Sequence, residues 1–178
     1  LGNEDYLSID EFYELVKTVP LRHQPDKKWQ YSNLGYFLLS MLVEEVSGET
    51  LREYADRRIF KPLGMTSTSY RHADYQKATN KALIHVPAGN KTWVAKYTRD
   101  ADAEAPAGGA SSSVRDLARW IRLQLANGSF EGSAVIDPDA LGVTHIPHAV
   151  SGPPATPGAR TRFYGLGWNV SYDDHARL

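Results

Sequence analysis

The stretch Trp29-Gln30-Tyr31-Ser32-Asn33-Leu34-Gly35-Tyr36 opens the most apolar segment of this chain. From residue 33 to residue 46 only two side chains are charged, and apolar side chains occupy almost every direction around a helical axis. A helix that is apolar all round is expected in the interior of a protein. The sequence therefore predicts a helix over 33–46 that is buried on most sides and ends at Ser47-Gly48.

Two shorter helices are predicted on either side of this segment. Ser8 and Glu11 have the Ser-x-x-Glu spacing of a capping box, and apolar residues then recur at helical spacing, which predicts a helix over about 8–19. A second capping box, from Thr50 to Glu53, predicts a helix that ends near Phe60.

A further helix is predicted over 113–127. Ser113 is its expected N-cap, Asp116 lies in its first turn, where a negative charge suits the helix dipole, and Asn127-Gly128 is its expected end. Helical spacing assigns five apolar residues to its buried face: Val114, Leu117, Ala118, Ile121 and Leu125.

The remaining segments predict loops and a sheet. Residues 66–106 have no sustained period and are expected to form loops with short strands or turns, and 106–113 is expected to be a flexible loop. Residues 147–158, rich in Pro and Gly, predict a surface loop, whereas 164–170 alternate with period two and predict a strand. The expected fold class is α+β, a mostly helical unit with the start of an antiparallel sheet.

Composition narrows the function classes. The chain has 178 residues, 42% of them hydrophobic, which suits one ordinary domain with a core. The formal net charge of -1 gives no basic surface for nucleic acid, so no nucleic-acid partner is expected. The absence of cysteine excludes thiol nucleophiles and leaves the cellular compartment open. The apolar run 34–43 is too short for a membrane span.

Tyr31 and Asn33 form a Tyr-x-Asn tripeptide at a helix entrance. A phenol and an amide held there suit a serine acyl-transfer site, the first as a proton relay and the second as a hydrogen-bonding group for the substrate. Ordinary packing and helix capping are the more frequent reason for such residues at a helix start. The tripeptide alone leaves both interpretations open.

Eight further blocks in order along the chain give the tripeptide a context. They are Pro25, Trp29, Gly35-Tyr36, Val46-Ser47-Gly48, Pro62-Leu63-Gly64-Met65, Ala107-Gly108-Gly109, Asp116-Leu117-Ala118 and Tyr164-Gly165-Leu166-Gly167-Trp168. With Tyr31-Ser32-Asn33, this order resembles the serine beta-lactamase and penicillin-binding-protein-like hydrolases, in particular the branch of class C beta-lactamases, D-amino-acid peptidases and carboxylesterases. Asp26 departs from the Gly that commonly follows the proline in that family.

The resemblance implies a helical subdomain packed on an antiparallel sheet, and three motifs: a Ser-x-x-Lys nucleophile, the Tyr-x-Asn loop and a Lys/His-x-Gly strand. Only the second is present here. The chain is therefore expected to be part of a longer protein, with the nucleophile before Leu1 and the third motif after Leu178. We expect 1–178 to be a partial domain, with its helical subdomain over about 8–145 and a return toward the sheet over about 160–172.

The resemblance also implies the roles of two residues. Tyr31 would be catalytic, moving the proton of the missing serine, and would need cationic neighbours to do so near neutral pH. Asn33 would bind the acyl amide of a substrate and the missing lysine. The substrate class implied is a beta-lactam, a D-amino-acid peptide or a small ester, no cofactor is expected, and a periplasmic or secreted location fits the family.

Several look-alike motifs fall short of the two missing ones. Ser112 is followed three residues later by Arg115 instead of Lys, and Lys91-Thr92-Trp93 has Trp where the third motif has Gly. Gly108 and Gly109 either let the backbone approach a cleft or permit a tight turn into the next helix.

The histidines and the acidic end of the chain suggest no second site. His145 and His148 are three residues apart, but Pro147 between them argues against a shared helical face, so no metal is expected. Asp173-Asp174-His175 suggests a triad only superficially, because no Gly-x-Ser-x-Gly elbow is present.

Two hypotheses follow for the function. The first is that the parent protein is a serine hydrolase, the present 178 residues being inactive by themselves. The second is that the unit is a non-catalytic scaffold or binding module. In either case the apolar helix over 33–46 needs cover, so self-association through exposed apolar surface is expected.

Overall fold

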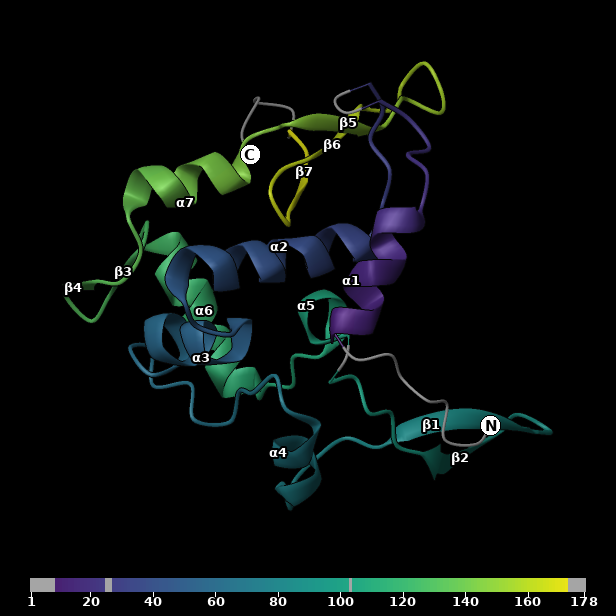
Figure 1. Ribbon diagram of the computed structural model, residues 1–178, viewed down its shortest axis with the longest axis vertical. Coiled ribbons are helices and arrows are strands. Elements are labelled where there is room, and N and C mark those ends of the chain that lie inside the picture. Colours follow the sequence, from purple (N-terminus) through teal and green to yellow (C-terminus); the bar gives the residue numbers. More distant parts are fainter. Residues whose placement is uncertain (1–8, 25–26, 103, 173–178) are drawn as a thin grey trace. The chain divides into compact units, whose positions relative to one another are not determined.

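The computed structural model describes residues 9–24, 27–102 and 104–172, and the chain forms two compact units (Figure 1). The first unit comprises Leu1–Val19 and Asn33–Leu117, and the second comprises Pro20–Ser32 and Ala118–Leu178. Helices and short antiparallel strands occur in both. This confirms the α+β class.

The first unit holds most of the helices. They are α1 (Ile9–Thr18), α2 (Asn33–Ser47), α3 (Leu51–Ala55), which continues as a π-helical turn over Asp56–Phe60, α4 (His72–Lys77) and α5 (Ala105–Gly108). A hairpin of β1 (Ile84–Gly89) and β2 (Thr92–Tyr97) completes this unit. The helices predicted over 8–19, 33–46 and from Thr50 to Phe60 are thus confirmed; Ser8 lies outside the described residues.

The second unit carries a three-stranded antiparallel sheet. Helix α6 (Val114–Leu125) leads into it, followed by the short hairpin of β3 (Ser129–Phe130) and β4 (Ser133–Ala134) and by α7 (Pro138–His145). The sheet consists of β5 (Ala149–Gly152), β6 (Arg162–Tyr164) and β7 (Asn169–Val170), with β6 in the centre. The predicted start of a sheet near the end of the chain is confirmed.

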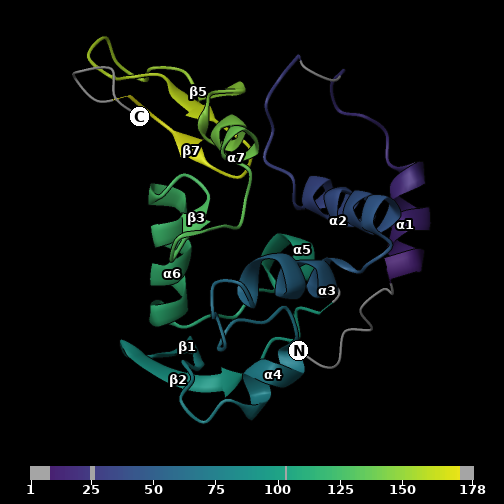
Figure 2. The ribbon, with the colours of Figure 1, turned by 90° about the vertical axis from the view of Figure 1, so that its left-hand side faces the viewer.

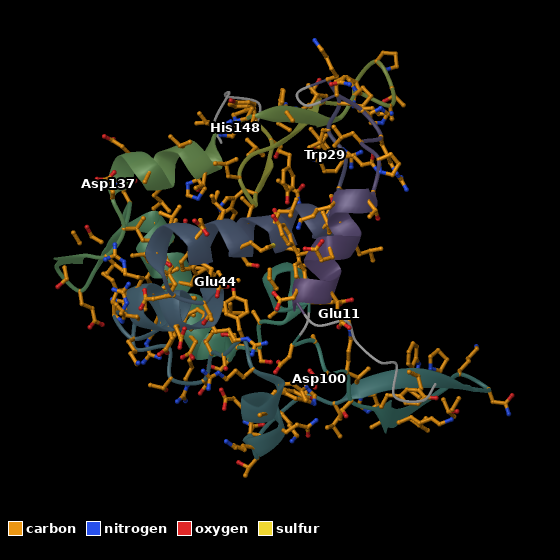
Figure 3. The ribbon with its side chains drawn as sticks, in the orientation of Figure 1. Glu11, Trp29, Glu44, Asp100, Asp137 and His148 are labelled. Carbon is orange, nitrogen blue, oxygen red and sulfur yellow. The ribbon has the colours of Figure 1, made fainter. Side chains whose placement is uncertain are left out.

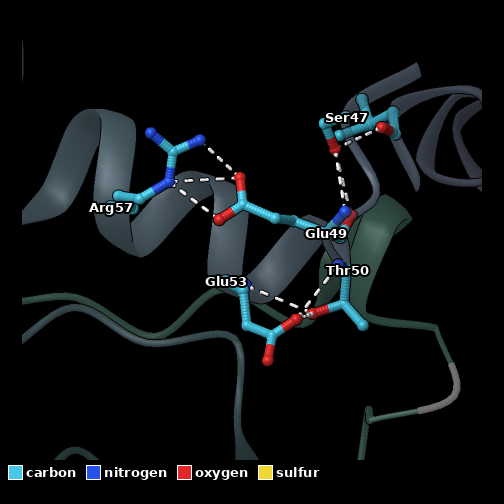
Figure 4. Close-up of polar contacts among 6 residues, drawn as sticks. Ser47, Glu49, Thr50, Glu53 and Arg57 are labelled. Atoms are coloured by element: carbon cyan, nitrogen blue, oxygen red, sulfur yellow. Dashed lines mark hydrogen bonds and ion pairs between the residues drawn. The ribbon is translucent and has the colours of Figure 1, made fainter. Parts of the chain in front are cut away.

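The end of α2 and the start of α3 are fixed by local hydrogen bonds (Figure 4). Gly48 has a φ of 70°, as expected for a left-handed helix terminator. Glu53 N donates to Thr50 Oγ1 at 3.3 Å and Thr50 N donates to Glu53 Oε2 at 3.1 Å, which confirms the predicted capping box. Arg57 Nε donates to Glu49 Oε1 at 2.8 Å and links this turn to the π-helical residues.

The prediction that α2 is buried on most sides is wrong. Its contacts with α3 and α5 are on one side, as Figures 1 and 2 both show, and Phe37 is its one buried residue. Leu38, Leu39, Leu42 and Val46 are exposed, Val46 to 79%. Two short helices cannot cover the whole circumference of a 15-residue helix, so these four side chains stay exposed over much of their surface.

The predicted buried face of α6 is also wrong. Val114, Leu117, Ala118, Ile121 and Leu125 are all exposed, whereas Asp116 and Leu123 are buried. The physical reason is the carboxylate of Asp116, which accepts hydrogen bonds from the 67–68 turn and therefore faces inward. Leu123 is seven residues later and shares that face. The predicted N-cap is confirmed, because Asp116 N donates to Ser113 Oγ at 3.2 Å.

Three loop predictions need correction. The segment 106–113 is not a flexible loop: it begins in α5, and Ser111 then forms a two-hydrogen-bond bridge with Ser69. The segment 147–158 contains β5, and 66–106 contains α4 besides the expected turns and strands. The predicted strand over 164–170 is instead two strands, β6 and β7, because Gly167, with a φ of 85°, turns the chain between them.

Candidate functional site

Tyr31 and Asn33 lie at the entrance to α2. Asn33 is the first residue of this helix, and Tyr31 precedes it by two residues in a segment without regular secondary structure. Both side chains are exposed, Tyr31 to 62%. A phenol and an amide are thus presented to solvent at one helix entrance, as the tripeptide predicted.

The electrostatics of this entrance favour negative charge. Helix α2 is 15 residues long and has no acidic side chain in its first turn, so no carboxylate of that turn offsets the positive end of the helix dipole. The amide of Asn33 can both donate and accept hydrogen bonds. The entrance is therefore suited to a group that carries or develops negative charge.

The segment that leads to Tyr31 is anchored by an aromatic contact within the second unit. The ring of Trp29 packs on the ring of Tyr164 in β6, with centroids 5.5 Å apart and an interplanar angle of 49°. Trp29 is labelled in Figure 3. Both residues belong to the blocks that carry the family resemblance. The sequence did not predict their contact, because no local pattern pairs residues so far apart in the chain.

Gly109 supports the tight-turn interpretation of the Gly108-Gly109 pair. A Cβ on Gly109 would lie 2.5 Å from Ala105 Cα, so the backbone of 109 packs directly on the start of α5. A Cβ on Gly108 would meet nothing within 4 Å. The close approach that needs glycine is made to the chain's own backbone.

The look-alike motifs have structural explanations. Ser112 Oγ lies 2.8 Å from Thr68 Oγ1 and shares a hydrogen bond with it. Lys91, with a φ of 60°, forms the turn between β1 and β2, and Trp93 follows it with 64% of its surface exposed. The look-alike of the third motif therefore begins in a hairpin turn.

The two histidines near the sheet have protein partners. His145 packs edge-on against Trp168 at 4.9 Å between ring centroids, and a ring nitrogen of His148 (Figure 3) lies 2.8 Å from the carbonyl oxygen of Val143. Within the residues that the structure describes, no group of three or more His, Cys, Asp or Glu side chains could hold a metal ion. Asp173-Asp174-His175 lies outside the described residues, as do Pro25 and Asp26.

Helix length and apolarity decide whether a segment can cross a membrane. Of the helices in the described part of the chain, none combines the length and the apolarity needed to cross a bilayer.

Comparison with known proteins supplies the family. The family model described as Beta-lactamase matches residues 1–177. A protein of Escherichia coli (strain K12) named "Putative D-alanyl-D-alanine carboxypeptidase" is 25% identical over 176 residues, which cover 89% of this chain and 38% of that protein. "Protein flp" of Staphylococcus aureus (strain NCTC 8325 / PS 47) is 30% identical over 105 residues, covering 59% of this chain and 21% of that protein.

Solved structures with the same fold include penicillin-binding-protein and amidohydrolase relatives. The octameric penicillin-binding protein homologue from Pyrococcus abyssi has a TM-score of 0.73 and 22% identity, over 92% of this chain and 35% of that one. The D-stereospecific amidohydrolase from Streptomyces sp. has a TM-score of 0.71 and 21% identity, over 92% of this chain and 45% of that one.

These matches extend over much of the chain but only part of each relative. The chain spans 38% of the length of the carboxypeptidase relative and 21% of protein flp. Because the family model covers residues 1–177, and because the fold agrees with the penicillin-binding-protein-like structures, the chain belongs to the beta-lactamase family.

Proposed function

We propose that the protein carrying this chain is a serine hydrolase that works through an acyl-enzyme, and that Tyr31 and Asn33 are this chain's contribution to its site. The observation that carries the proposal is the exposed Tyr31 at the entrance of α2, in a chain matched over residues 1–177 by the beta-lactamase family model. The substrate class is a beta-lactam, a D-amino-acid peptide or a small ester.

The proposed reaction has two steps. The hydroxyl oxygen of a serine outside these 178 residues attacks the carbonyl carbon of the substrate, and the bond from that carbon to the leaving amine or alcohol breaks. Tyr31 takes the serine proton and passes it to the leaving group. A water molecule then attacks the carbonyl carbon of the acyl-serine ester, and the bond from that carbon to the serine oxygen breaks. The acid is released, and one proton of the water restores the serine hydroxyl.

Asn33 binds the substrate in this proposal. Its amide N–H donates to the carbonyl oxygen of the acyl amide, and its side-chain oxygen accepts from the lysine of the Ser-x-x-Lys motif. The positive end of α2, whose first turn has no acidic side chain, favours the negative charge that develops on the attacked carbonyl oxygen. The effect of the helix end stabilises the transition state relative to the bound substrate, whereas the hydrogen bonds of Asn33 hold the substrate in both states.

The 178 residues by themselves are proposed to be inactive. No serine in the sequence has a lysine three residues later, so the nucleophile and its base are not supplied by this chain. The same observation favours the second candidate function, a scaffold or binding module that keeps the fold without the reaction.

Self-association is the proposed property of the isolated chain. Leu38, Leu39, Leu42 and Val46 form an exposed apolar stripe along α2, since they recur at spacings of three and four residues. A contiguous apolar stripe of this kind favours association with another apolar surface.

Intact-mass spectrometry with a penicillin and with a short activated ester tests the proposed function. The complete protein should gain one acyl group, and replacing the serine of its Ser-x-x-Lys motif by alanine should abolish the gain. The 178-residue chain, at 19.8 kDa, should gain none. A complete protein that has the motif and still acquires no adduct would favour the scaffold hypothesis, and an adduct on the 178-residue chain would show that the nucleophile lies within it.

A further inference from the structure

Tyr31 is exposed and outside regular secondary structure, yet a proton relay must be held in one place. A displacement of about 1 Å can reduce a reaction rate about a hundredfold. Tyr31 therefore requires a contact that restrains the chain segment leading to it. This contact is the packing of Trp29 on Tyr164, which are both partly buried.

Tyr164 is itself held firmly. It lies in β6, the central strand of the sheet, where it pairs with Ala149 on one side and Asn169 on the other. Its carbonyl oxygen accepts a hydrogen bond from His148 N at 2.9 Å. A residue paired on both sides has little freedom to move along or across the sheet.

The turn that follows Tyr164 packs on the end of α7 and is hydrogen-bonded to it. Gly165 is buried, and a Cβ on it would lie 2.4 Å from Thr144 O, so only glycine permits this approach. Leu166 N donates to Thr144 O at 2.9 Å, and Trp168 packs edge-on against His145. The segment directly after Tyr164 is thus held by contacts with the end of α7.

The contact of Trp29 with Tyr164 also restrains the position of Tyr31. Tyr31 is two positions after Trp29, and two residues of fully extended chain span at most about 7 Å. Fixing the indole ring against Tyr164 therefore limits where the backbone of Tyr31 can lie. A large aromatic pair also holds its geometry better than two aliphatic side chains, because the rings favour particular relative orientations.

We propose that Trp29 and Tyr164 are positioning residues that hold Tyr31 in place for acyl transfer. This inference rests on the proposed role of Tyr31. It assigns no chemistry to Trp29 or Tyr164, which act only through the segment 29–31. It also gives a function to the block Tyr164-Gly165-Leu166-Gly167-Trp168, which supplies the base of the contact.

The test is a double-mutant cycle in the complete protein, with acylation by an activated ester as the readout. Trp29→Leu should lower kcat about ten- to a hundredfold with little change in KM, because the relay is misplaced while substrate binding is kept. Trp29→Phe should restore most of the rate, since it retains an aromatic face. In a Tyr31→Phe background, Trp29→Leu should have almost no further effect.

The matched control is a second aromatic pair on the same strand. Phe163 precedes Tyr164 in β6, so its side chain points to the opposite face of the sheet, where it packs on Tyr172 at 6.0 Å between centroids. Phe163→Leu disturbs the same strand but leaves the Trp29 contact in place. It should keep kcat within about twofold of the unmodified protein.

The outcomes separate this inference from the proposed function. If Trp29→Leu lowers kcat equally with Tyr31 intact and in the Tyr31→Phe background, the positioning role is overturned, as it is by an equal loss on Phe163→Leu. No loss on Tyr31→Phe alone would overturn the role of Tyr31, and with it the inference.

A second readout does not depend on catalysis. Trp29→Leu should speed amide hydrogen exchange at residues 30–32 of the 178-residue chain, and Phe163→Leu should not. If the complete protein forms no acyl-enzyme, the proposed function fails, whereas this measurement still decides whether Trp29 orders the segment. Unchanged exchange at 30–32 in Trp29→Leu would overturn the inference.

Discussion

The carboxylate of Asp116 accepts a hydrogen bond from the backbone N–H of Ser67 at 2.7 Å, although 49 residues separate them in the chain. The same oxygen accepts from Thr68 Oγ1 at 2.9 Å, and Asp116 is only 2% exposed. The sequence predicted that Asp116 interacts favourably with the dipole of α6. The structure shows that it also connects this helix to the 67–68 turn. The connection sets which face of α6 is buried.

Replacing Asp116 by alanine should destabilise the chain by about 2 to 3 kcal/mol. The loss leaves the N–H of Ser67 and the hydroxyl of Thr68 without this acceptor in a partly buried place. Asp116→Asn should cost less, because an amide oxygen still accepts. Urea unfolding followed by circular dichroism measures both. Asp139, exposed in the first turn of α7, is the control, and a loss in Asp139→Ala equal to that in Asp116→Ala would contradict the argument.

The free energy of unfolding should fall in acid because of two carboxyl groups at the start of α3, those of Glu49 and Glu53. A hydrogen bond from Arg57 holds the pKa of Glu49 below its ordinary value, and a side-chain hydrogen bond from Thr50, helped by the Thr50 backbone N–H, lowers the pKa of Glu53. A carboxyl whose pKa is lower in the folded chain contributes stability above its unfolded pKa of about 4.3. That contribution is lost as the pH falls through the folded pKa.

Unfolding midpoints measured from about pH 6 down to about pH 3 check this sign. The double variant Glu49→Gln, Glu53→Gln should be less stable than the unmodified chain near neutral pH and should lose less stability on acidification. If the unfolding midpoints of the double variant and of the unmodified chain fall in parallel with pH, these two carboxyl groups do not contribute to the acid sensitivity.

Gln124 in α6 should tolerate or favour an apolar replacement. Both polar atoms of its side chain are buried, and neither has a hydrogen-bond partner among the described residues. Burying an unpaired amide is unfavourable, so Gln124→Met should leave the free energy of unfolding unchanged or raise it by about 1 kcal/mol. A loss of about 1 kcal/mol or more would mean that the amide is paired in solution. Gln76→Met, at an exposed position, should change stability by less than about 0.5 kcal/mol.

The apolar stripe on α2 should drive association of the isolated chain. Sedimentation velocity over a range of concentrations should show species larger than the 19.8 kDa monomer. Leu39→Gln with Leu42→Gln should shift the distribution toward monomer, because both leucines are more than half exposed in the stripe. Leu83→Gln replaces an exposed leucine outside it and should have no effect. A monomer at all concentrations would refute the prediction.

Helix boundaries were predictable from the sequence where the signal is local. Thr50 and Glu53 are three residues apart, so the capping box is visible in the sequence, and Gly48 ends α2 by its own backbone preference. The buried face of α6 was not predictable, because it depends on a hydrogen bond from Ser67 to the carboxylate of Asp116, and 49 residues separate these two in the chain. Periodicity describes an amphipathic helix but does not say which partner is present to cover it.

The sheet shows the same limit. Alternation over 164–170 predicts one strand, but Gly165 packs on Thr144 and Gly167 turns the chain, which divides the segment into two. For the candidate site, the family resemblance identified Tyr31 and Asn33, and the structure places them at one helix entrance. The contact of Trp29 with Tyr164 could be found only from the fold, since it joins the two separate segments of the chain that make up the second unit.

The central claim is that the hydroxyl of Tyr31 moves a proton during acyl transfer. The most direct measurement is kcat for hydrolysis of an activated ester by the complete protein and its Tyr31→Phe variant. Tyr97→Phe, in the β1–β2 hairpin, serves as the control for loss of an exposed phenol. We predict that Tyr31→Phe lowers kcat by about a hundredfold or more while Tyr97→Phe leaves it unchanged. Equal rates for Tyr31→Phe and the unmodified protein would contradict the claim.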